Sequence, residues 1–399
     1  MSGVEKIKPT IGILKESLCL GGTERSAANI SKILEKDFEL FLLLFNSLDI
    51  KYPYGGNLID INAAPKKSRL GKIYNSFVRY FRVKKILKNK DINILYEFIS
   101  IENMLSIAKY KNVKRIISAR DFGKMQRKTG KFHKALSKAN AMICNSEYIK
   151  NFYLLKYPKD KDKVFTVYNI IDCESINQQA TEIVEKEFID FANKHTKIIC
   201  AVGRFCKEKG FEYMLEAFAK VAEKIDLGLV MIGDGSYKEK YLKIIQKLKI
   251  EDKVYFTGFQ NNPYKYMDKS DIFVLSSLSE GFPNVLVEAM SLGLPVIASN
   301  CYSGPAEILR NDCDYEAVTD SFAESDYGII TPRFTDGNNL RAIEQLSAAL
   351  QILATDDSLA QKYSALSKQR ALEYSFENAR INFKDIIDKI CINNDTNKS

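Results

Sequence analysis

Short apolar runs alternate along this chain with longer stretches in which apolar residues recur every three or four positions. The short runs indicate buried strands, and the longer period indicates amphipathic helices. The predicted strands of the first half cover residues 10–14, 38–45, 91–98, 113–119 and 141–146. The predicted strands of the second half cover residues 197–203, 227–233, 253–258, 271–277, 295–299 and 327–331. Strands that alternate with helices in this way favour right-handed βαβ units, and therefore parallel sheets.

Two sets of such strands predict an α/β protein with two doubly wound, Rossmann-like domains. The break is predicted near residues 172–196, which are polar and contain no apparent strand. We therefore expect a first domain over residues 1–175 and a second over residues 176–375. Residues 376–399 are predicted to form a last helix that packs back on the first domain, followed by a polar tail.

The composition is that of an ordinary soluble protein, with 46% apolar and 27% charged residues. No apolar run approaches the roughly 18–20 residues of a membrane-spanning helix, and the first apolar stretch is too short for a secretory signal. The eight cysteines form no Cys-x-x-Cys pair and there are only two histidines, which argues for reduced thiols and against structural zinc. We therefore expect a cytoplasmic protein.

The positive charge of the chain is concentrated in its first half. Up to Ser175 there are 33 Lys and Arg residues against 17 Asp and Glu, whereas the remainder has 26 against 33. The stretch from Lys66 to Lys90 has ten basic residues and no acidic one. Apolar residues interleave with them at roughly helical spacing, and they are Ile73, Phe77, Tyr80, Phe81, Ile86 and Leu87.

Such a basic amphipathic helix is typical of a segment that lies on an anionic membrane surface. The alternative is a helix that packs on its own domain and leaves its basic face in water. We favour membrane contact, because the whole first half is basic. The basic residues assigned to this membrane or acceptor surface are Arg79, Arg82, Lys84, Lys85 and Lys88.

Four loops at predicted carboxyl ends of strands carry candidate binding residues, and doubly wound sheets bind ligands at these ends. The loops cover residues 20–25, 202–210, 232–236 and 280–288. Glycines in the first and third let the backbone approach a ligand, although such glycines can equally mark tight turns. The second holds Arg204 and Lys209, two cations that could bind a diphosphate or could be solvated surface charges.

The segment from Glu280 to Glu288 is the most informative part of the sequence. It follows a predicted strand and leads into a helix, which Pro283 and Asn284 are expected to start. The first amides of a helix have no partner within it, and together with the helix dipole they attract anions. With a carboxylate at each end, the segment suits a ligand that has a phosphate between hydroxyl-rich groups. A sugar nucleotide is such a ligand.

Together these loops resemble those of the retaining, nucleotide-sugar-dependent glycosyltransferases of the GT-B fold, in the family 4 group of bacterial polysaccharide and glycan synthesis. The matching motifs occur in the expected order and spacing over nearly the whole chain. They are GGTER (21–25), VGRFCKEKG (202–210), IGDG (232–235), FTGF (256–259), SEGFPNVLVEAMSLGLPVIAS (279–299), SGPAEIL (303–309) and YGIITP (327–332). The resemblance implies two doubly wound domains that face each other across a cleft.

The resemblance also implies roles for the candidate residues. Arg204 and Lys209 would neutralise the donor diphosphate. Glu288 would accept hydrogen bonds from the ribose, and Glu280 would lie beside the transferred sugar. Catalysis would rest on positioning and electrostatics, without a metal ion or other cofactor. The implied donor-binding residues are Gly21, Gly22, Gly203, Arg204, Lys209, Gly233, Gly235, Phe259, Gln260, Glu280, Gly281, Phe282, Pro283, Asn284, Val285 and Glu288.

One position departs from the family pattern. Many relatives have a histidine near the donor sugar, after a middle strand of the first domain, but residues 118–125 of this chain contain none. Arg120 and Asp121 occupy the region instead. Arg120 is assigned to acceptor binding. Asp121 is a candidate for orienting the acceptor, and a helix cap is its alternative role.

The predicted function is the transfer of a hexose or N-acetylhexosamine from a nucleotide sugar, commonly a UDP sugar, to a glycan acceptor. The resemblance implies a lipid-diphosphate-linked saccharide as acceptor, in surface polysaccharide or glycoconjugate synthesis at the inner face of the plasma membrane. A sugar-nucleotide epimerase or an inverting transferase of the same fold is the nearest alternative. A nucleic-acid-binding module is disfavoured by the acidic second half. A non-catalytic scaffold is disfavoured because both glutamates and both cations are present.

Overall fold

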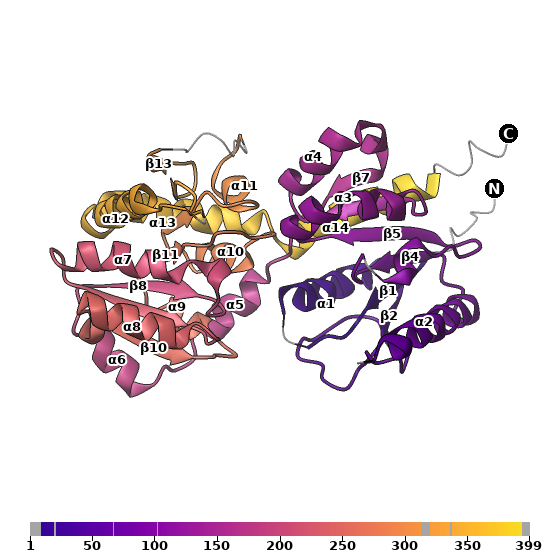
Figure 1. Ribbon diagram of the computed structural model, residues 1–399, viewed down its shortest axis with the longest axis horizontal. Helices are drawn as coiled ribbons and strands as arrows, with labels where there is room; N and C mark the ends of the chain where they lie inside the picture. The colour runs from indigo at the N-terminus through magenta and orange to yellow at the C-terminus, as the bar shows by residue number, and fades with distance from the viewer. Residues whose placement is uncertain are drawn as a thin grey trace, which may run out of the picture. The chain divides into compact units, whose positions relative to one another are not determined.

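The computed structural model describes residues 9–19, 21–66, 68–101, 103–312, 320–335 and 337–392. The chain divides into two compact units, whose elements are labelled in Figure 1. Unit 1 consists of Met1–Ile170 and Phe376–Ser399, and unit 2 consists of Ile171–Ser375. The division falls after Ile170, whereas the sequence pattern places it after Ser175.

Unit 1 is built on a parallel sheet with seven strands in the described residues. The strands are β1 (Thr10–Lys15), β2 (Glu39–Leu44), β3 (Asn57–Asp60), β4 (Ile94–Glu97), β5 (Lys114–Ala119), β6 (Ala141–Cys144) and β7 (Val164–Thr166). Their order in the sheet is β3-β2-β1-β4-β5-β6-β7. The order reverses between β1 and β4, and we call this position the switch point of the sheet. There, Ile11 pairs with Ile94 and Leu14 with Glu97.

Helices cover both faces of this sheet (Figure 1). They are α1 (Gly22–Leu34), α2 (Arg69–Asn89), α3 (Phe122–Leu136), α4 (Glu147–Lys156) and α14 (Phe376–Ile392), with the 3₁₀ helices η1 (Met104–Ile107) and η2 (Pro158–Lys163). Successive residues of a strand point to opposite faces. Ile13 of β1 joins the core cluster of α1 and α14, whereas Leu14 joins that of α2 and η1. These two pairs of helices therefore lie on opposite faces of the sheet.

Unit 2 repeats this architecture, with the strand order β10-β9-β8-β11-β12-β14-β13 and a switch point between β8 and β11. The strands are β8 (Lys197–Val202), β9 (Leu227–Ile232), β10 (Val254–Gly258), β11 (Ile272–Leu275), β12 (Val296–Ser299), β13 (Ala323–Glu324) and β14 (Ile329–Thr331). β13 is antiparallel to β14, and the other pairs are parallel.

The helices of unit 2 are α5 (Cys173–Ala180), α6 (Lys186–Ala192), α7 (Phe211–Ala222), α8 (Lys238–Leu248), α9 (Tyr264–Met267), α10 (Asn284–Ser291), α11 (Pro305–Leu309), α12 (Leu340–Thr355) and α13 (Asp357–Leu372), with the 3₁₀ helices η3 (Lys207–Lys209) and η4 (Glu251–Lys253). One large core cluster of this unit includes α7, α12 and alternate residues of the central strands.

The predicted fold class, two doubly wound α/β domains, is confirmed. The sequence pattern misses β3, β7 and β13, all of which lie at sheet edges. They have four, three and two residues, and no residue of β3 is buried. An edge strand with so little burial leaves no continuous apolar run in the sequence. The polar segment 172–196 forms α5 and α6.

The last helix, α14, completes the core of unit 1. Its buried side chains pack in the cluster shared by α1, β1 and β2, and they are Ala379, Phe383, Ile386, Ile387 and Ile390. Near its start, Arg380 binds Asp37 with two hydrogen bonds of 2.6 and 2.7 Å. Unit 1 is therefore formed by two segments from opposite ends of the chain.

A buried ion pair joins β4 to β5 in unit 1. Arg115 Nε donates to Glu97 Oε1 at 2.7 Å, and Arg115 Nη2 donates to Glu97 Oε2 at 2.8 Å. The two side chains are 2% and 1% exposed. The same guanidinium donates to the backbone carbonyls of Leu105, Ser106 and Ala108. Arg115 therefore anchors η1, which follows β4, to the sheet.

Candidate active site

The switch point of unit 2 brings two candidate loops together. Doubly wound sheets bind ligands beyond the carboxyl ends of the strands at this position. β8 leads into the loop that contains Arg204 and Lys209, and β11 leads into the loop that contains Glu280. Lys209 and Glu280 are 71 residues apart in the sequence, but their side chains are in contact.

Lys209 and Glu280 form an ion pair across the switch point. Lys209 Nζ lies 2.6 Å from Glu280 Oε1, and Ser277 Oγ donates to the same oxygen at 2.6 Å. The charged side chains are 21% and 12% exposed. Burial alone would lower the pKa of Lys209, but the Glu280 carboxylate outweighs this effect and raises that pKa above its usual value. Lys209 is therefore a charged, largely enclosed cation.

A second loop, after β12, fixes the position of Glu280. The Glu280 N–H donates to Tyr302 O at 2.7 Å, and the Ser303 N–H donates back to Glu280 O at 3.0 Å. Ser303 Oγ also donates to Gly281 O at 2.7 Å. These bonds hold the backbone of Glu280, while Ser277 and Lys209 hold its side chain.

The helix α10 begins directly after this loop. Its first residue is Asn284, and Pro283 precedes it as the N-cap residue. The Leu286 N–H donates to Pro283 O at 3.0 Å. Within the described residues, the Val285 N–H has no backbone acceptor. A free amide at a helix start can donate to an anion.

Glu288 has a different environment from Glu280. It lies one turn inside α10 and is only 3% exposed. α10 packs against α5 and α13. Burial raises the pKa of the Cys173 thiol, at the start of α5, to about 11, with further contributions from the negative charges of Asp172 and Glu288. The two carboxylates of the segment therefore have different surroundings. Glu280 lies in the loop before α10, and Glu288 is buried on α10 itself.

Gly233 and Gly235 allow the loops after β8 and β9 to pack together. A Cβ on Gly233 would lie 2.0 Å from the carbonyl oxygen of Gly203, and a Cβ on Gly235 would lie 2.4 Å from that of Phe205. The Phe205 N–H also donates to Asp234 O at 2.8 Å. These two glycines therefore permit a close approach between the backbones of two loops.

Other residues predicted for donor binding differ in their exposure. Arg204 is exposed directly after β8. The side chain of Phe259 is 58% exposed, whereas that of Phe282 is 6% exposed. Gln260 Nε2 donates to Thr257 O at 2.9 Å, within its own loop. Arg204 and Phe259 are therefore accessible, and Phe282 belongs to the packing of the Glu280 loop.

The glycine pair of unit 1 lies at the start of α1. The helix begins at Gly22, and a Cβ at this residue would meet no atom within 4 Å.

A cluster of charged side chains lies at the carboxyl end of β1, where Lys15 is only 5% exposed. Its Nζ lies 3.1 Å from Glu16 Oε2 and 3.0 Å from Glu24 Oε1. One buried ammonium group is therefore neutralised by two carboxylates.

Arg120 is fixed by neutral groups of unit 1. Its hydrogen-bond acceptors are Ser26 Oγ, Tyr96 OH, Ser118 Oγ and Asn169 Oδ1. The guanidinium also lies 4.6 Å from the centre of the Phe98 ring. Because these groups come from α1, β4, β5 and the segment after β7, Arg120 ties several elements together at the carboxyl edge of the sheet.

Asp121 is the N-cap residue of α3. Its Oδ1 accepts a hydrogen bond from the Lys124 N–H at 2.8 Å. This is the geometry of a helix cap, the alternative role that its position before a helix suggests.

One face of α2 is both apolar and exposed. The exposed fractions are 81% for Leu70, 49% for Ile73, 70% for Tyr74, 49% for Phe77 and 63% for Phe81. At 100° per residue, Lys84, Lys85 and Lys88 continue the same face, and all three are exposed. Within the described part of the chain, no helix has the length and apolar content needed to cross a bilayer.

Arg79 and Arg82, which the sequence analysis groups with the three lysines, lie away from this apolar face of α2. Arg79 Nη2 donates to Ala63 O at 2.8 Å, and Arg82 Nη1 donates to Ile61 O at 2.9 Å. Both guanidinium groups are held by the loop before α2. Three of the predicted apolar residues also pack toward the core, namely Tyr80, Ile86 and Leu87.

Sequence reasoning missed Ser277 and Lys15. Ser277 stands three residues before Glu280, just after β11, so a search for hydroxyl groups near the predicted carboxylate could have found it. No comparable signal marks Lys15, because its two partners become neighbours only when β1 and α1 pack together.

Two family profiles match the chain. The profile described as Glycosyltransferase Family 4 matches residues 20–175, and the profile described as Glycosyl transferases group 1 matches residues 183–320. The first match falls almost wholly in unit 1, and the second falls in unit 2. Each unit is therefore matched by its own profile.

Similar proteins include an uncharacterised glycosyltransferase of Methanocaldococcus jannaschii. It is 32% identical over 249 residues, which are 60% of this chain and 61% of that protein. The N-acetylgalactosamine-N,N'-diacetylbacillosaminyl-diphospho-undecaprenol 4-alpha-N-acetylgalactosaminyltransferase of Campylobacter jejuni is 28% identical over 383 residues, which are 90% of this chain and 94% of that protein.

The fold is also similar to a solved structure. The crystal structure of Anabaena HepE in complex with UDP and glucose matches with a TM-score of 0.70 and 16% identity, over 95% of this chain and 99% of that one. At this identity the likeness establishes the fold. Together with the two profiles, it shows that the chain belongs to family 4 of the glycosyltransferases and is a glycosyltransferase of the GT-B fold.

Proposed function

We propose that this protein transfers a hexose or N-acetylhexosamine from a UDP-linked donor to a glycan acceptor, with retention of the anomeric configuration. The acceptor in this proposal is a lipid-diphosphate-linked saccharide at a membrane surface. The Lys209–Glu280 ion pair at the switch point of unit 2 is the observation that carries the donor half. Support for the acceptor comes from the Campylobacter jejuni relative, whose name includes a diphospho-undecaprenol-linked substrate.

The donor diphosphate would lie between the β8 loop and the start of α10. Lys209 and the exposed Arg204 would supply two positive charges, and the free Val285 amide would supply a hydrogen bond. Glu288 would accept hydrogen bonds from the ribose, and the exposed ring of Phe259 would lie by the base.

In the proposed reaction, the acceptor hydroxyl attacks the anomeric carbon as the bond from that carbon to the phosphate oxygen breaks. The hydroxyl proton passes to the leaving phosphate oxygen. Lys209 and Arg204 stabilise the negative charge that develops on the diphosphate, and no metal ion takes part. Once the diphosphate occupies Lys209, the Glu280 carboxylate is released to stabilise positive charge at the anomeric carbon.

Thermal unfolding of the full chain with UDP, GDP, ADP and their sugars tests the donor assignment. We expect stabilisation by UDP and UDP sugars, amounting to about 2.7 kcal/mol at a ligand concentration of 100 Kd. The absence of a shift with any UDP compound would overturn the donor proposal. The control for epimerase activity is to incubate the protein with the stabilising sugar nucleotide in the absence of an acceptor. Formation of an isomerised sugar nucleotide would contradict group transfer.

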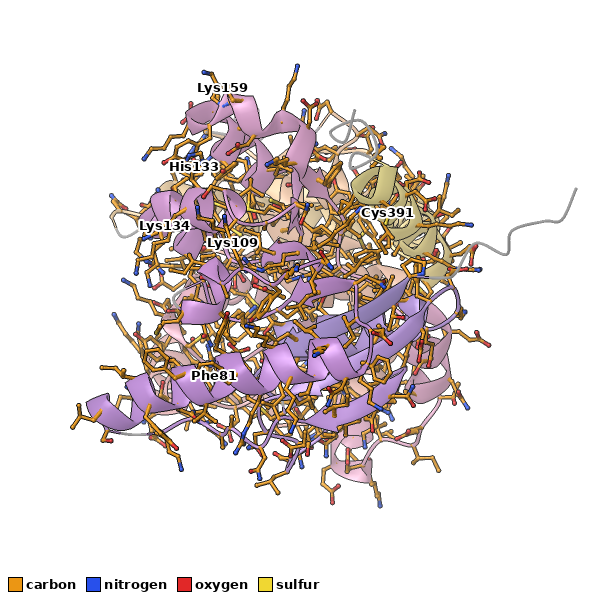
Figure 2. All side chains as sticks on the ribbon, turned by 90° about the vertical axis from the view of Figure 1, so that its right-hand side faces the viewer. Phe81, Lys109, His133, Lys134, Lys159 and Cys391 are labelled. Carbon is orange, nitrogen blue, oxygen red and sulfur yellow. The ribbon has the colours of Figure 1, made fainter. Side chains whose placement is uncertain are left out.

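The membrane part of the proposal rests on the outward face of α2. This face has a row of exposed apolar side chains followed by three lysines, which suits the boundary between acyl chains and anionic headgroups. Figure 2 shows Phe81 on the side of unit 1 from which Lys109, Lys134 and Lys159 also project. Anionic lipid would therefore meet positive charge beyond α2 as well.

Flotation with phosphatidylglycerol-containing vesicles tests this surface. The triple charge reversal of Lys84, Lys85 and Lys88 to Glu should reduce binding at least about tenfold, because each lysine near an anionic surface contributes about 1 kcal/mol. The matched control reverses three exposed lysines of unit 2, namely Lys220, Lys243 and Lys247. Equal binding by wild type and the α2 variant would remove α2 from the membrane contact.

A further inference from the structure

The loop that contains Glu280 packs against the segment just beyond α13 through two aromatic rings. The centres of the Phe282 and Tyr374 rings lie 5.3 Å apart, and the rings are inclined at 59°. Phe282 is 6% exposed and Tyr374 is 4% exposed. The Ile171 N–H donates to Tyr374 O at 2.9 Å, so the backbone of Tyr374 is held as well. Tyr374 is therefore a fixed, buried support for the residue two positions after Glu280.

A second support comes from the segment that starts α11. Gly304 is the N-cap residue of α11 and has a φ of 102°. A Cβ at Gly304 would lie 2.5 Å from Pro283 Cδ and 3.3 Å from Phe282 Cα, so only glycine allows this approach. One residue earlier, Ser303 Oγ donates to Gly281 O at 2.7 Å. A shift of α11 would therefore move the loop that contains Glu280.

The far end of α11 is held by Arg370 of α13. The last carbonyls of a helix have no partner within it. Arg370 Nη2 donates to Glu307 O at 2.7 Å, and Arg370 Nε donates to Ile308 O at 2.9 Å. The next carbonyl, Leu309 O, accepts from the Tyr327 N–H at 3.1 Å. Successive carbonyls at this end of α11 are thus bonded, two of them by the same guanidinium.

This guanidinium also lies against two tyrosine rings. It is 4.7 Å from the centre of the Tyr327 ring and 5.5 Å from that of Tyr374. Its Nη1 lies 2.5 Å from Glu373 Oε2, and the Arg370 side chain is only 12% exposed. A planar guanidinium can donate to acceptors in its plane and stack on rings at the same time. Arg370 therefore joins both supports of the Glu280 loop, α11 and Tyr374.

We propose that Tyr374 and Arg370 are positioning residues of the donor site, which act on the transferred sugar through the Glu280 loop without touching the donor. Tyr374 supports Phe282, and Arg370 holds α11 behind Pro283. The inference rests on the proposed function, which brings the Glu280 loop next to the sugar. A displacement of about 1 Å in a group that positions a substrate can cost about 10²-fold in rate.

The expected effect of losing these supports is selective for the sugar. In the proposed function, most contacts to the nucleoside diphosphate come from the β8 loop and Glu288, whereas the Glu280 loop lies beside the sugar. Loss of either support should therefore weaken binding of a sugar nucleotide more than binding of its nucleoside diphosphate. A residue that only stabilises the fold would weaken both equally or neither.

Hydrogen exchange of the full chain without ligand tests whether Tyr374 supports the loop. Tyr374→Leu removes the ring but keeps an apolar side chain, and should speed exchange of the Glu280 and Ser303 amides at least about tenfold. Tyr374→Phe keeps the ring and should match the wild type. The matched control is Tyr363→Leu, the same replacement at a fully buried tyrosine of α13 whose hydroxyl donates to Ser325 O.

Isothermal titration then compares the affinity for a nucleoside diphosphate with that for its sugar. The ligands are UDP with UDP-N-acetylglucosamine, UDP-N-acetylgalactosamine, UDP-glucose and UDP-galactose, and then GDP with GDP-mannose and ADP with ADP-glucose. We expect Tyr374→Leu to bind the sugar nucleotide at least about fivefold more weakly than the wild type, and the nucleoside diphosphate less than about twofold more weakly. Arg370→Lys keeps the positive charge but loses the planar pattern of donors, so the same selective loss is expected. Circular dichroism first confirms that each variant is folded at the temperature used.

The outcomes separate this inference from the donor assignment. A selective loss in Tyr374→Leu and Arg370→Lys, but not in Tyr374→Phe or Tyr363→Leu, supports the proposal. Equal weakening of both ligands in Tyr374→Leu, or unchanged binding of both, overturns it even when the amides exchange faster. An equal selective loss in Tyr363→Leu also overturns it. Binding of a GDP or ADP pair alone would contradict the UDP assignment, and the positioning role is then decided with that pair. No binding of any sugar nucleotide to the wild type would contradict both.

Discussion

The sheets of units 1 and 2 have the same strand order up to the last edge, and each has a lysine beside a glutamate at its switch point. In unit 2, Lys209 has one carboxylate partner, Glu280, and the exposed Arg204 lies in the same loop. In unit 1, Lys15 is buried between Glu16 and Glu24. The first arrangement has an excess of positive charge, and the second has an excess of negative charge.

This difference separates the chemistry of the two switch points. The lysine at the switch point of unit 2 is available to a diphosphate once Glu280 releases it. The equivalent lysine of unit 1 is already paired with two carboxylates, so it is not available to an anion. A shared fold thus has different charges at the same position of its two sheets.

The largest effect is expected from the removal of Arg115, whose ion pair with Glu97 lies in the interior of unit 1 and has no part in the charges at either switch point. Arg115→Met leaves the Glu97 carboxylate buried without a cation, and should lower the free energy of unfolding of unit 1 by about 3–5 kcal/mol. Urea unfolding followed by circular dichroism measures the loss. UDP binding at low temperature should be unchanged, because Arg115 belongs to unit 1 and the proposed donor site is built from residues of unit 2.

The control for this variant is Arg127→Met, which replaces an exposed arginine of α3 and should change stability by less than about 0.5 kcal/mol. An equal loss in both variants would mean that arginine chemistry in general, and not the buried ion pair, stabilises unit 1.

The second prediction concerns Lys209, the largely enclosed cation at the switch point of unit 2. Lys209→Ala should lower kcat by about 10²–10³, because a positioned cation no longer stabilises the departing diphosphate. The melting temperature should change little, since Glu280 keeps its bond from Ser277. Steady-state kinetics with the identified donor gives the measurement. Lys207→Ala, in the same 3₁₀ helix, is the matched control, and an equal effect of that variant would contradict a specific role for Lys209.

The third prediction tests whether Glu288 and Glu280 of unit 2 have different roles. Glu288→Gln should raise the donor KM by about 10- to 100-fold with a smaller change in kcat, because a hydrogen bond to a charged group contributes about 1.5–3 kcal/mol. Initial rates over a range of donor concentrations separate the two constants. Glu223→Gln, an exposed change at the end of α7, should leave both unchanged. A loss confined to kcat would instead place Glu288 at the reacting sugar.

The smallest effect is expected at Asp121, where unit 1 has a helix cap. Asp121→Ala should lower stability by about 0.5–2 kcal/mol, whereas Asp121→Asn should keep the cap and the stability. Activity assays at low temperature, where both variants are folded, test its second candidate role. We expect the Asn variant to remain active, and a selective loss of activity in that variant would assign Asp121 to the acceptor.

Much of this organisation can be predicted from the sequence because the central strands are long apolar runs. β1, β2, β8 and β9 are buried over nearly their whole length, which leaves a clear signal. β3, β7 and β13 give no such signal, because edge strands need few buried residues. The loop motifs are predictable for a different reason, since each combines glycines, charges and a helix start within a few positions.

The remaining features depend on which residues become neighbours after folding. The sequence groups Arg79 and Arg82 with the other basic residues of α2, and it gives no sign that the carbonyls of Ala63 and Ile61 hold these two at the loop before the helix. The ion pair between Lys209 and Glu280 joins the segments that follow β8 and β11, and these are neighbours because of the strand order. A pattern along one chain carries no such information.

The return of α14 to unit 1 has a consequence for how the chain is made. A ribosome completes all of unit 2 before it reaches Phe376, and unit 2 has its own hydrophobic core. Unit 1 must wait, because Phe383 and Ile387 fill part of its interior. Most of unit 1 is thus synthesised before unit 2, but the hydrophobic core of unit 2 can be completed before that of unit 1. Until α14 has been synthesised, the growing chain carries an open apolar surface on its N-terminal half, and this seventeen-residue helix is the piece that covers it.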